Sequence, residues 1–112
     1  MALTRSFRET VAKRAKDDPA FRAALVEEAM QNLVEGEVEV ALGQIRDVVN
    51  ATVGFDALAA ETGIGKTSLM RMLRREGNPR ADNLGGILKA LGRHTGARVV
   101  VNAEPLHEAR SA

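Results

Sequence analysis

Hydrophobic residues recur along most of this chain at intervals of three and four, which is the period of an amphipathic helix. Phe7, Val11 and Ala15 follow this spacing and predict a short first helix. Ser6 and Glu9 stand where a capping box would place them, with the serine accepting from the third helical N–H and the glutamate returning to the cap. We therefore expect the first helix to begin after Ser6.

Two longer helices are predicted next. Asp18 is a favourable N-cap and Pro19 suits the first helical position, so a second helix is expected to begin here and to end before Gly36. An apolar stripe of helical period predicts a third helix from about Glu37 to Thr52. Gly54 is expected to end that helix.

The second half of the chain is more finely divided by glycine and proline. Gly85 and Gly86 fall inside one predicted helix, which means either that a neighbouring element approaches closely or that the helix is locally weak. The expected elements are a short helix at Ala57–Glu61 capped by Asp56, a tight turn at Gly63–Gly65, a helix at Lys66–Arg75, a loop at Gly77–Arg80, a helix at Asp82–Arg93, and one strand at Ala97–Asn102.

The predicted strand has no partner strand within the chain. Because its backbone N–H and C=O groups need hydrogen-bond partners, we expect Arg98, Val99, Val100 and Val101 to pair with the same segment of a second copy across a two-fold axis. The alternative is a strand that lies on its own domain with solvated edges.

Residues 55–75 carry the most informative pattern. Ala59 is small where two helices must approach, Gly63 can take the positive φ of a turn, and Leu69 falls on the inner face of the following helix. This spacing is typical of a helix-turn-helix, although it also fits a plain pair of packed helices. The expected buried seam consists of Leu58, Ile64, Leu69, Met72 and Leu73.

The second helix of this pair would present basic and hydroxyl side chains to solvent. Arg71 is the candidate for a base edge; its alternative is an ion pair with Glu61 or Glu76 that only stabilises the helices. Lys66 and Thr67 would lie near bases or phosphates. Arg74, Arg75 and Arg80 would bind phosphates. The full set of candidate DNA-binding residues is Lys66, Thr67, Ser68, Met70, Arg71, Arg74, Arg75 and Arg80.

Charge is unevenly distributed although the net charge of the 112 residues is only +1. Residues 1–17 hold five basic and two acidic side chains, residues 18–62 two basic and nine acidic, and residues 63–112 nine basic and four acidic. Basic ends around an acidic middle fit a small protein in which only the DNA-contacting face is positive. The simpler reading is chance clustering of charges.

The composition argues against most enzyme classes. The chain has no cysteine and two isolated histidines, His94 and His107, so we expect no catalytic residue, no metal site and no cofactor. The sequence GIGKTS resembles the end of a phosphate-binding loop, but Ala60 stands where that loop needs glycine. Phe7, Phe21 and Phe55 sit at core-like positions, which argues against single-strand binding by stacking. With no apolar run near the ~20 residues of a membrane span and no apolar leader, the protein is expected in the cytoplasm.

Several motifs together resemble the lambda-repressor-like (Xre) helix-turn-helix proteins, and within them the addiction-module antidote (antitoxin) family. They are the helix from Phe7, the helix from Asp18-Pro19 to Gly36, Ala41–Ile45, the turn at Ala59–Gly63, Gly77–Arg80 and the sequence LGGILKALG. The chain departs from the family pattern at Gly65, where serine is usual, and at the Gly85–Gly86 pair.

The resemblance implies an all-α fold of five or six helices around a central helix-turn-helix, to which we add one C-terminal strand. We expect a basic helical arm at residues 1–17, the main domain at 18–103 and a flexible tail at 104–112. The implied function is that of a homodimeric repressor that binds a palindromic double-stranded operator of its own operon and neutralises a toxin. The alternative is an antidote whose acidic helices bind a small basic toxin, with little or no DNA binding.

Overall fold

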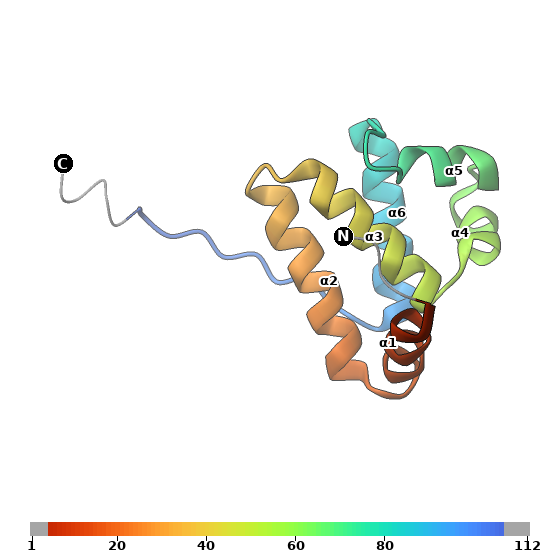
Figure 1. The fold of residues 1–112 in the computed structure, drawn as a ribbon. Helices are drawn as coiled ribbons and strands as arrows, with labels where there is room; N and C mark the ends of the chain where they lie inside the picture. Colours follow the sequence, from red (N-terminus) through yellow and green to blue (C-terminus); the bar gives the residue numbers. More distant parts are fainter. Residues whose placement is uncertain (1–4, 107–112) are drawn as a thin grey trace.

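The computed structural model describes residues 5–106 and is all-helical over this range, with no strand (Figure 1). The predictions about His107 and about most of the 104–112 tail lie outside the residues described. The helices are α1 (Arg5–Asp17), α2 (Pro19–Val34), α3 (Val38–Ala51), α4 (Phe55–Thr62), α5 (Lys66–Met72) and α6 (Ala81–Thr95).

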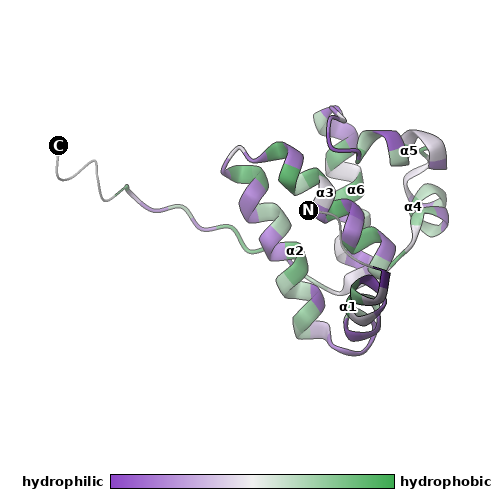
Figure 2. Cartoon of the chain, viewed as in Figure 1, coloured by the Kyte–Doolittle hydropathy of each residue, from purple (hydrophilic) through white to green (hydrophobic). Residues whose placement is uncertain are grey.

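The core forms where α2, α3 and α6 meet and where α4 and α5 close over one side. Helices α2 and α3 pack against each other along their length, and α4 contacts both α5 and α6. Each long helix has hydrophobic and hydrophilic residues on different sides, as Figure 2 shows by colour. The largest fully buried side chains from α3 to α6 include Leu42, Ile45, Leu58, Leu69, Leu73, Ile87 and Leu91. This apolar burial is the main stabilising contribution to the fold.

Arg22 joins three helices at the base of the molecule. Its Nη1 donates to the carbonyl oxygens of Ala15 (2.7 Å) and Lys16 (3.1 Å) at the end of α1. Its Nε donates to the carbonyl oxygen of Thr95 (2.9 Å) at the end of α6. Since carbonyls at a helix C-terminus lack intrahelical partners, one guanidinium satisfies groups that the fold would otherwise leave unpaired.

The start of α2 is as predicted, whereas two other predicted helix starts are wrong. Asp18 accepts a hydrogen bond from the N–H of Phe21 (3.2 Å), with Pro19 as the first helical residue. Ser6 is not a cap, because α1 already includes Arg5, and Glu9 pairs with Arg5 (3.5 Å). Local spacing alone therefore misplaced the start of α1.

The predicted cap of α4 is also wrong. The helix begins at Phe55 after Gly54, whose φ of 80° turns the chain, so that Asp56 lies within the first turn. Phe55 is buried and is the first residue of the helix. Phe7, by contrast, was expected in the core and is 52% exposed, while Phe21 is half-buried beneath the Arg14 guanidinium.

Helix α5 ends three residues earlier than predicted, at Met72, and α6 extends to Thr95. The chain turns back tightly after α5, and a Cβ on Gly77 would overlap the carbonyl oxygen of Met72 and lie 2.8 Å from that of Arg71. Gly77 is therefore required by the close approach of two backbone segments. Gly85 and Gly86 have nothing within 4 Å of an added Cβ, so close packing does not explain that pair.

Residues 97–106 form neither helix nor strand in this single chain. The segment starts beside α2, where Ala97 is half-buried, and then extends away from the helices (Figure 1). Val100 and Val101 are 82% and 87% exposed. The strand expected at 97–102 is thus absent from the single chain, and its pairing with a second copy stays a prediction.

Candidate nucleic-acid interface

A sharp glycine turn joins α4 to α5. Gly63 ends α4 in the left-handed region at φ 75°, and its N–H donates to the carbonyl oxygen of Ala59 (2.9 Å). The hydroxyl of Thr62 accepts from the N–H of Ile64 (3.2 Å). Gly65 then precedes α5 as its N-cap. The positive φ expected at Gly63 is therefore confirmed. A residue with a Cβ would be strained at this φ.

The inner face of the α4–α5 pair is the apolar seam that the sequence predicts. Leu58, Leu69 and Leu73 are fully buried in the core. Ile64 and Met72 are partly buried and pack against the same cluster. This seam fixes which side of α5 faces the solvent.

The outer face of α5 carries most of the candidate DNA-binding residues. Lys66, Thr67, Met70 and Arg71 are exposed, and Met70 presents 47% of its surface. Their spacing of one, four and five residues puts them on one side of the helix. Ser68 is half-buried, so it is the least available member of the predicted set.

Three of the predicted cations are held in exposed ion pairs. Lys66 Nζ lies 3.0 Å from a carboxylate oxygen of Asp56, at the start of α4. Arg75 Nε lies 3.0 Å from Glu39 of α3. Arg80 lies 3.3 Å from Asp82. Each pair is largely solvated and is worth about 0–1 kcal/mol, so a phosphate can replace the carboxylate at small cost.

Arg71 and Arg74 have no ion pair with any residue from 5 to 106. Glu61, a suggested partner of Arg71, lies instead 2.9 Å from His94 Nε2 and 3.9 Å from Arg93 of α6. An open groove of about 450 Å³ brings Arg71 and Arg74 together with Arg80, beside the loop that Gly77 shapes. The structure thus gathers three of the predicted arginines around one hollow.

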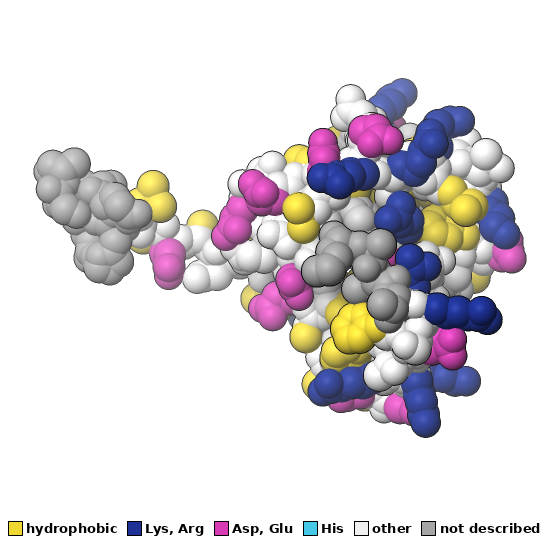
Figure 3. Space-filling model, in the orientation of Figure 1, with side chains coloured by type: hydrophobic (Ala, Val, Ile, Leu, Met, Phe, Trp, Pro, Cys, Tyr) yellow, Lys and Arg dark blue, Asp and Glu magenta, His cyan; other side chains and the backbone are white. Residues whose placement is uncertain are grey.

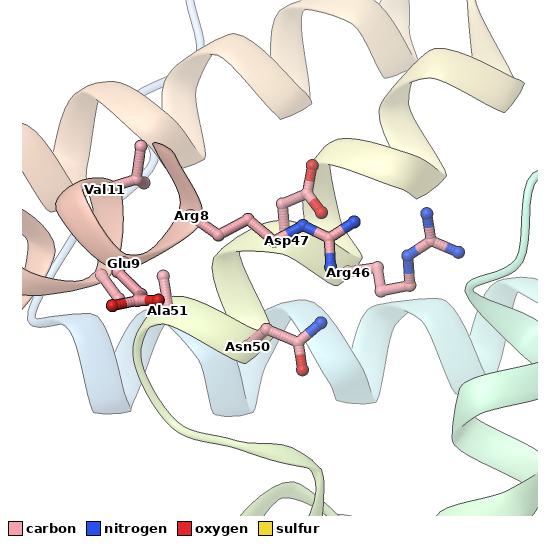
Figure 4. Close-up of a pocket in the computed structure, with 8 residues that line it drawn as sticks. Arg8, Glu9, Val11, Arg46, Asp47, Asn50 and Ala51 are labelled. Atoms are coloured by element: carbon pink, nitrogen blue, oxygen red, sulfur yellow. The ribbon is translucent and has the colours of Figure 1, made fainter. Parts of the chain in front are cut away.

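Two further arginines were missed by the sequence analysis. Arg8 of α1 and Arg46 of α3 line a groove of about 630 Å³, and Figure 4 shows both guanidiniums on the same side of α3. No local motif marks either residue, and they are 38 positions apart in the sequence. Only the packing of α1 against α3 brings them together.

Basic and acidic side chains are unevenly distributed over the surface. Figure 3 shows Lys and Arg over α5 at the upper right, over the middle near α3, and over α1 at the lower edge. Acidic side chains gather toward the turn between α2 and α3, where Glu35 and Glu37 precede α3 and Glu39 lies in its first turn. We call the basic side chains over α5, α3 and α1 the positive band, within which Lys66 and Arg75 are paired with carboxylates, and the side chains of Glu35 and Glu37 the acidic corner.

No family model, curated protein or solved structure matches this chain. Among the six helices described, none combines the length and the apolar character that crossing a membrane requires. Within residues 5–106, no three His, Cys, Asp or Glu side chains come together as a metal site.

Proposed function

We propose that the protein is a dimeric, sequence-specific DNA-binding regulator in which α4 and α5 form a helix-turn-helix. The observation that carries the proposal is the division of α5 into two faces. Leu69 is fully buried beneath the helix, while Lys66, Thr67, Met70 and Arg71 are all exposed on the other side. A short helix that is anchored inside and basic outside is suited to enter the major groove.

Arg71 is the residue proposed to read a base. It has no ion pair within the described chain, and its guanidinium can bond the O6 and N7 atoms of guanine together. Arg74 and Arg80 share the same groove and would bind the phosphates beside that base. Lys66 and Arg75 would reach phosphates after releasing Asp56 and Glu39.

The dimer and the regulatory role are also part of this proposal. The extended segment 98–101 leaves its backbone free of any ladder in the single chain and would pair with a second copy. A two-fold dimer presents two recognition helices and therefore favours a palindromic operator. The resemblance to addiction-module antidotes supports an antitoxin that represses its own operon, with a small basic toxin as its protein partner.

A second candidate function rests on a different surface. Val34, Val38 and Val40 are 73%, 45% and 48% exposed at the turn between α2 and α3, interleaved with Glu35, Glu37 and Glu39. An apolar patch surrounded by carboxylates suits a basic protein partner and would repel DNA. In this alternative the chain neutralises a toxin through its acidic helices and binds DNA weakly or not at all.

The test of DNA reading compares cognate and random duplexes. DNA from upstream of the protein's own gene is titrated with the wild type, Arg71→Ala and Arg75→Ala at two salt concentrations. Arg71→Ala should lose about 1–3 kcal/mol per half-site on the cognate duplex and narrow the preference over random DNA. Arg75→Ala should weaken both duplexes alike and lower the salt slope by about one unit.

If Arg71→Ala lowers the melting temperature but leaves the ratio of the cognate to the random affinity unchanged, α5 is not the helix that recognises bases. The protein-binding alternative is tested by coexpression with any small basic protein encoded next to the gene. Reversing Glu35 and Glu37 to lysine should abolish that complex and leave specific DNA binding intact. Loss of specific DNA binding by this folded variant would contradict the assignment of the acidic corner.

A further inference from the structure

We propose that Arg8 and Arg46 form a phosphate-binding site in the groove between α1 and α3, and that this site extends the DNA contact surface beyond α5. The inference rests on the proposed DNA-binding function but concerns elements outside the helix-turn-helix. Its ligand is a phosphate group, which a DNA backbone or a small phosphorylated ligand could supply.

The groove is lined by two arginines from different helices and by polar side chains of α3. Arg8 reaches across from α1, and Arg46 extends from α3 in the direction of the green ribbon of α4 and α5 (Figure 4). Asp47 and Asn50 complete the α3 side. Two guanidiniums beside an amide provide many N–H donors, which is the donor set that phosphate oxygens accept.

The two arginines of the groove form no ion pair with its two acidic lining residues, Glu9 and Asp47. Neither Arg8 nor Arg46 lies within 4.0 Å of a carboxylate of residues 5–106, although Asp47 lines the same groove. Glu9, the other acidic lining residue, is engaged by Arg5 at 3.5 Å. Two like charges held near one hollow without a bonded counter-ion favour an anion that lies between them.

Arg46 is the better fixed of the two arginines. It is half-buried, so its side chain has less conformational freedom to lose on binding than the exposed Arg8. The groove lies between α1 and α3, and basic side chains are seen over α5, near α3 and over α1 on one face of the molecule (Figure 3). A DNA backbone that leaves α5 along this face would meet the α1–α3 groove next.

The experiment uses the full chain with three groove variants and one control. Arg8→Ala and Arg46→Gln each remove one positive charge, and Asp47→Asn removes the negative charge that would repel a phosphate. Asp47 is exposed and makes no ion pair in the described chain, so its replacement should leave the fold unchanged. Lys89→Ala is the matched control, because it removes one exposed positive charge from α6, outside this groove.

Binding to the upstream duplex and to a random duplex is measured over a range of salt concentrations. Arg8→Ala and Arg46→Gln should each weaken both duplexes by roughly three- to tenfold and lower the salt slope by about 0.9 per phosphate lost. Asp47→Asn should bind both duplexes more tightly, and Lys89→Ala should bind both with the wild-type affinity. Groove variants that bind as tightly as the wild type, while Arg71→Ala loses specificity, would overturn this inference and leave the proposed function standing.

A second arm separates DNA from a small ligand. The melting temperature is followed as inorganic phosphate replaces chloride at constant ionic strength. If the wild type binds no DNA, the proposed function fails; a phosphate-dependent rise that Arg46→Gln abolishes would then assign the groove to a small phosphorylated ligand. The absence of both DNA binding and the phosphate effect would overturn the site altogether.

Discussion

The Nε of Arg22 donates a hydrogen bond to the carbonyl oxygen of Thr95 at 2.9 Å, across 73 positions of the chain. The same guanidinium donates to Ala15 at 2.7 Å. Thr95 is itself buried, and its hydroxyl donates to the carbonyl oxygen of Leu91 at 2.8 Å. The ends of α1 and α6 are therefore held by one side chain of α2.

Replacing Arg22 by alanine should destabilise the protein. The change leaves three helix-end carbonyls, those of Ala15, Lys16 and Thr95, without their donor, and hydrogen bonds to a charged group contribute roughly 1.5–3 kcal/mol. Urea unfolding should show a midpoint lowered accordingly. Arg93→Ala is the control, because its pair with Glu61 is long (3.9 Å) and solvated, and it should cost less than about 1 kcal/mol. Equal midpoints for the two variants would show that Arg22 does not link the helices.

Alanine substitutions at two adjacent residues of α5, Leu69 and Met70, should affect protein stability and DNA binding separately. Leu69 is fully buried, so Leu69→Ala should lower the free energy of unfolding by about 2–5 kcal/mol through the cavity it leaves. Met70 is 47% exposed, and Met70→Ala should change stability by less than about 0.5 kcal/mol while weakening DNA binding. Thermal unfolding and duplex titration measure the two effects. A destabilised Met70→Ala variant would mean that α5 is rotated from the orientation described.

Alanine substitutions at Gly77 and at Gly85 should change the free energy of unfolding in opposite directions. Gly77→Ala meets two backbone carbonyls and should destabilise by roughly 1–3 kcal/mol. Gly85→Ala meets nothing within 4 Å inside α6 and should stabilise by about 0.5–1 kcal/mol. Unfolding in urea measures both variants. A stabilised Gly77→Ala would contradict the tight return of the chain after α5.

Proline at Val100 should abolish the proposed dimer. Val100 is 82% exposed, so the substitution leaves the helical core intact while it removes one N–H from the expected ladder. Sedimentation should then show a monomer. Val100→Thr, which keeps both the N–H and the β-branch, should remain dimeric. A dimeric Val100→Pro variant would place the interface on the helices.

The sequence predicted helix termini correctly where they depend on the local backbone preferences of Asp, Pro and Gly. Asp18 and Pro19 start α2, and Gly63 takes the positive φ that ends α4. The predicted start of α1 was wrong, because Ser6 fits the spacing of a capping box but lies inside the helix. The end of α5 was missed because the backbone contact at Gly77 is invisible in a helical pattern.

The candidate site was likewise predicted only where it depends on residues close together in the sequence. The side of α5 that is exposed follows from spacing around Leu69, and spacing is local. The partners of the site's cations are not local, since Glu39 pairs with Arg75 from 36 positions away in the sequence. Arg8 and Arg46 likewise meet only because α1 packs on α3, so no linear motif could have identified their groove.

The exposed ion pairs of Lys66 with Asp56 and of Arg75 with Glu39 have a consequence for selectivity in a crowded cell. RNA, heparin-like polymers and other polyanions that meet this surface find part of its positive charge already matched by the protein's own carboxylates. They must compete with these internal counter-ions at every encounter. A duplex that also satisfies Arg71 gains base contacts that a featureless polyanion lacks. In the proposed DNA-binding role, these carboxylates lower the affinity for every polyanion by the same small free energy, and the base contacts of Arg71 distinguish the correct duplex.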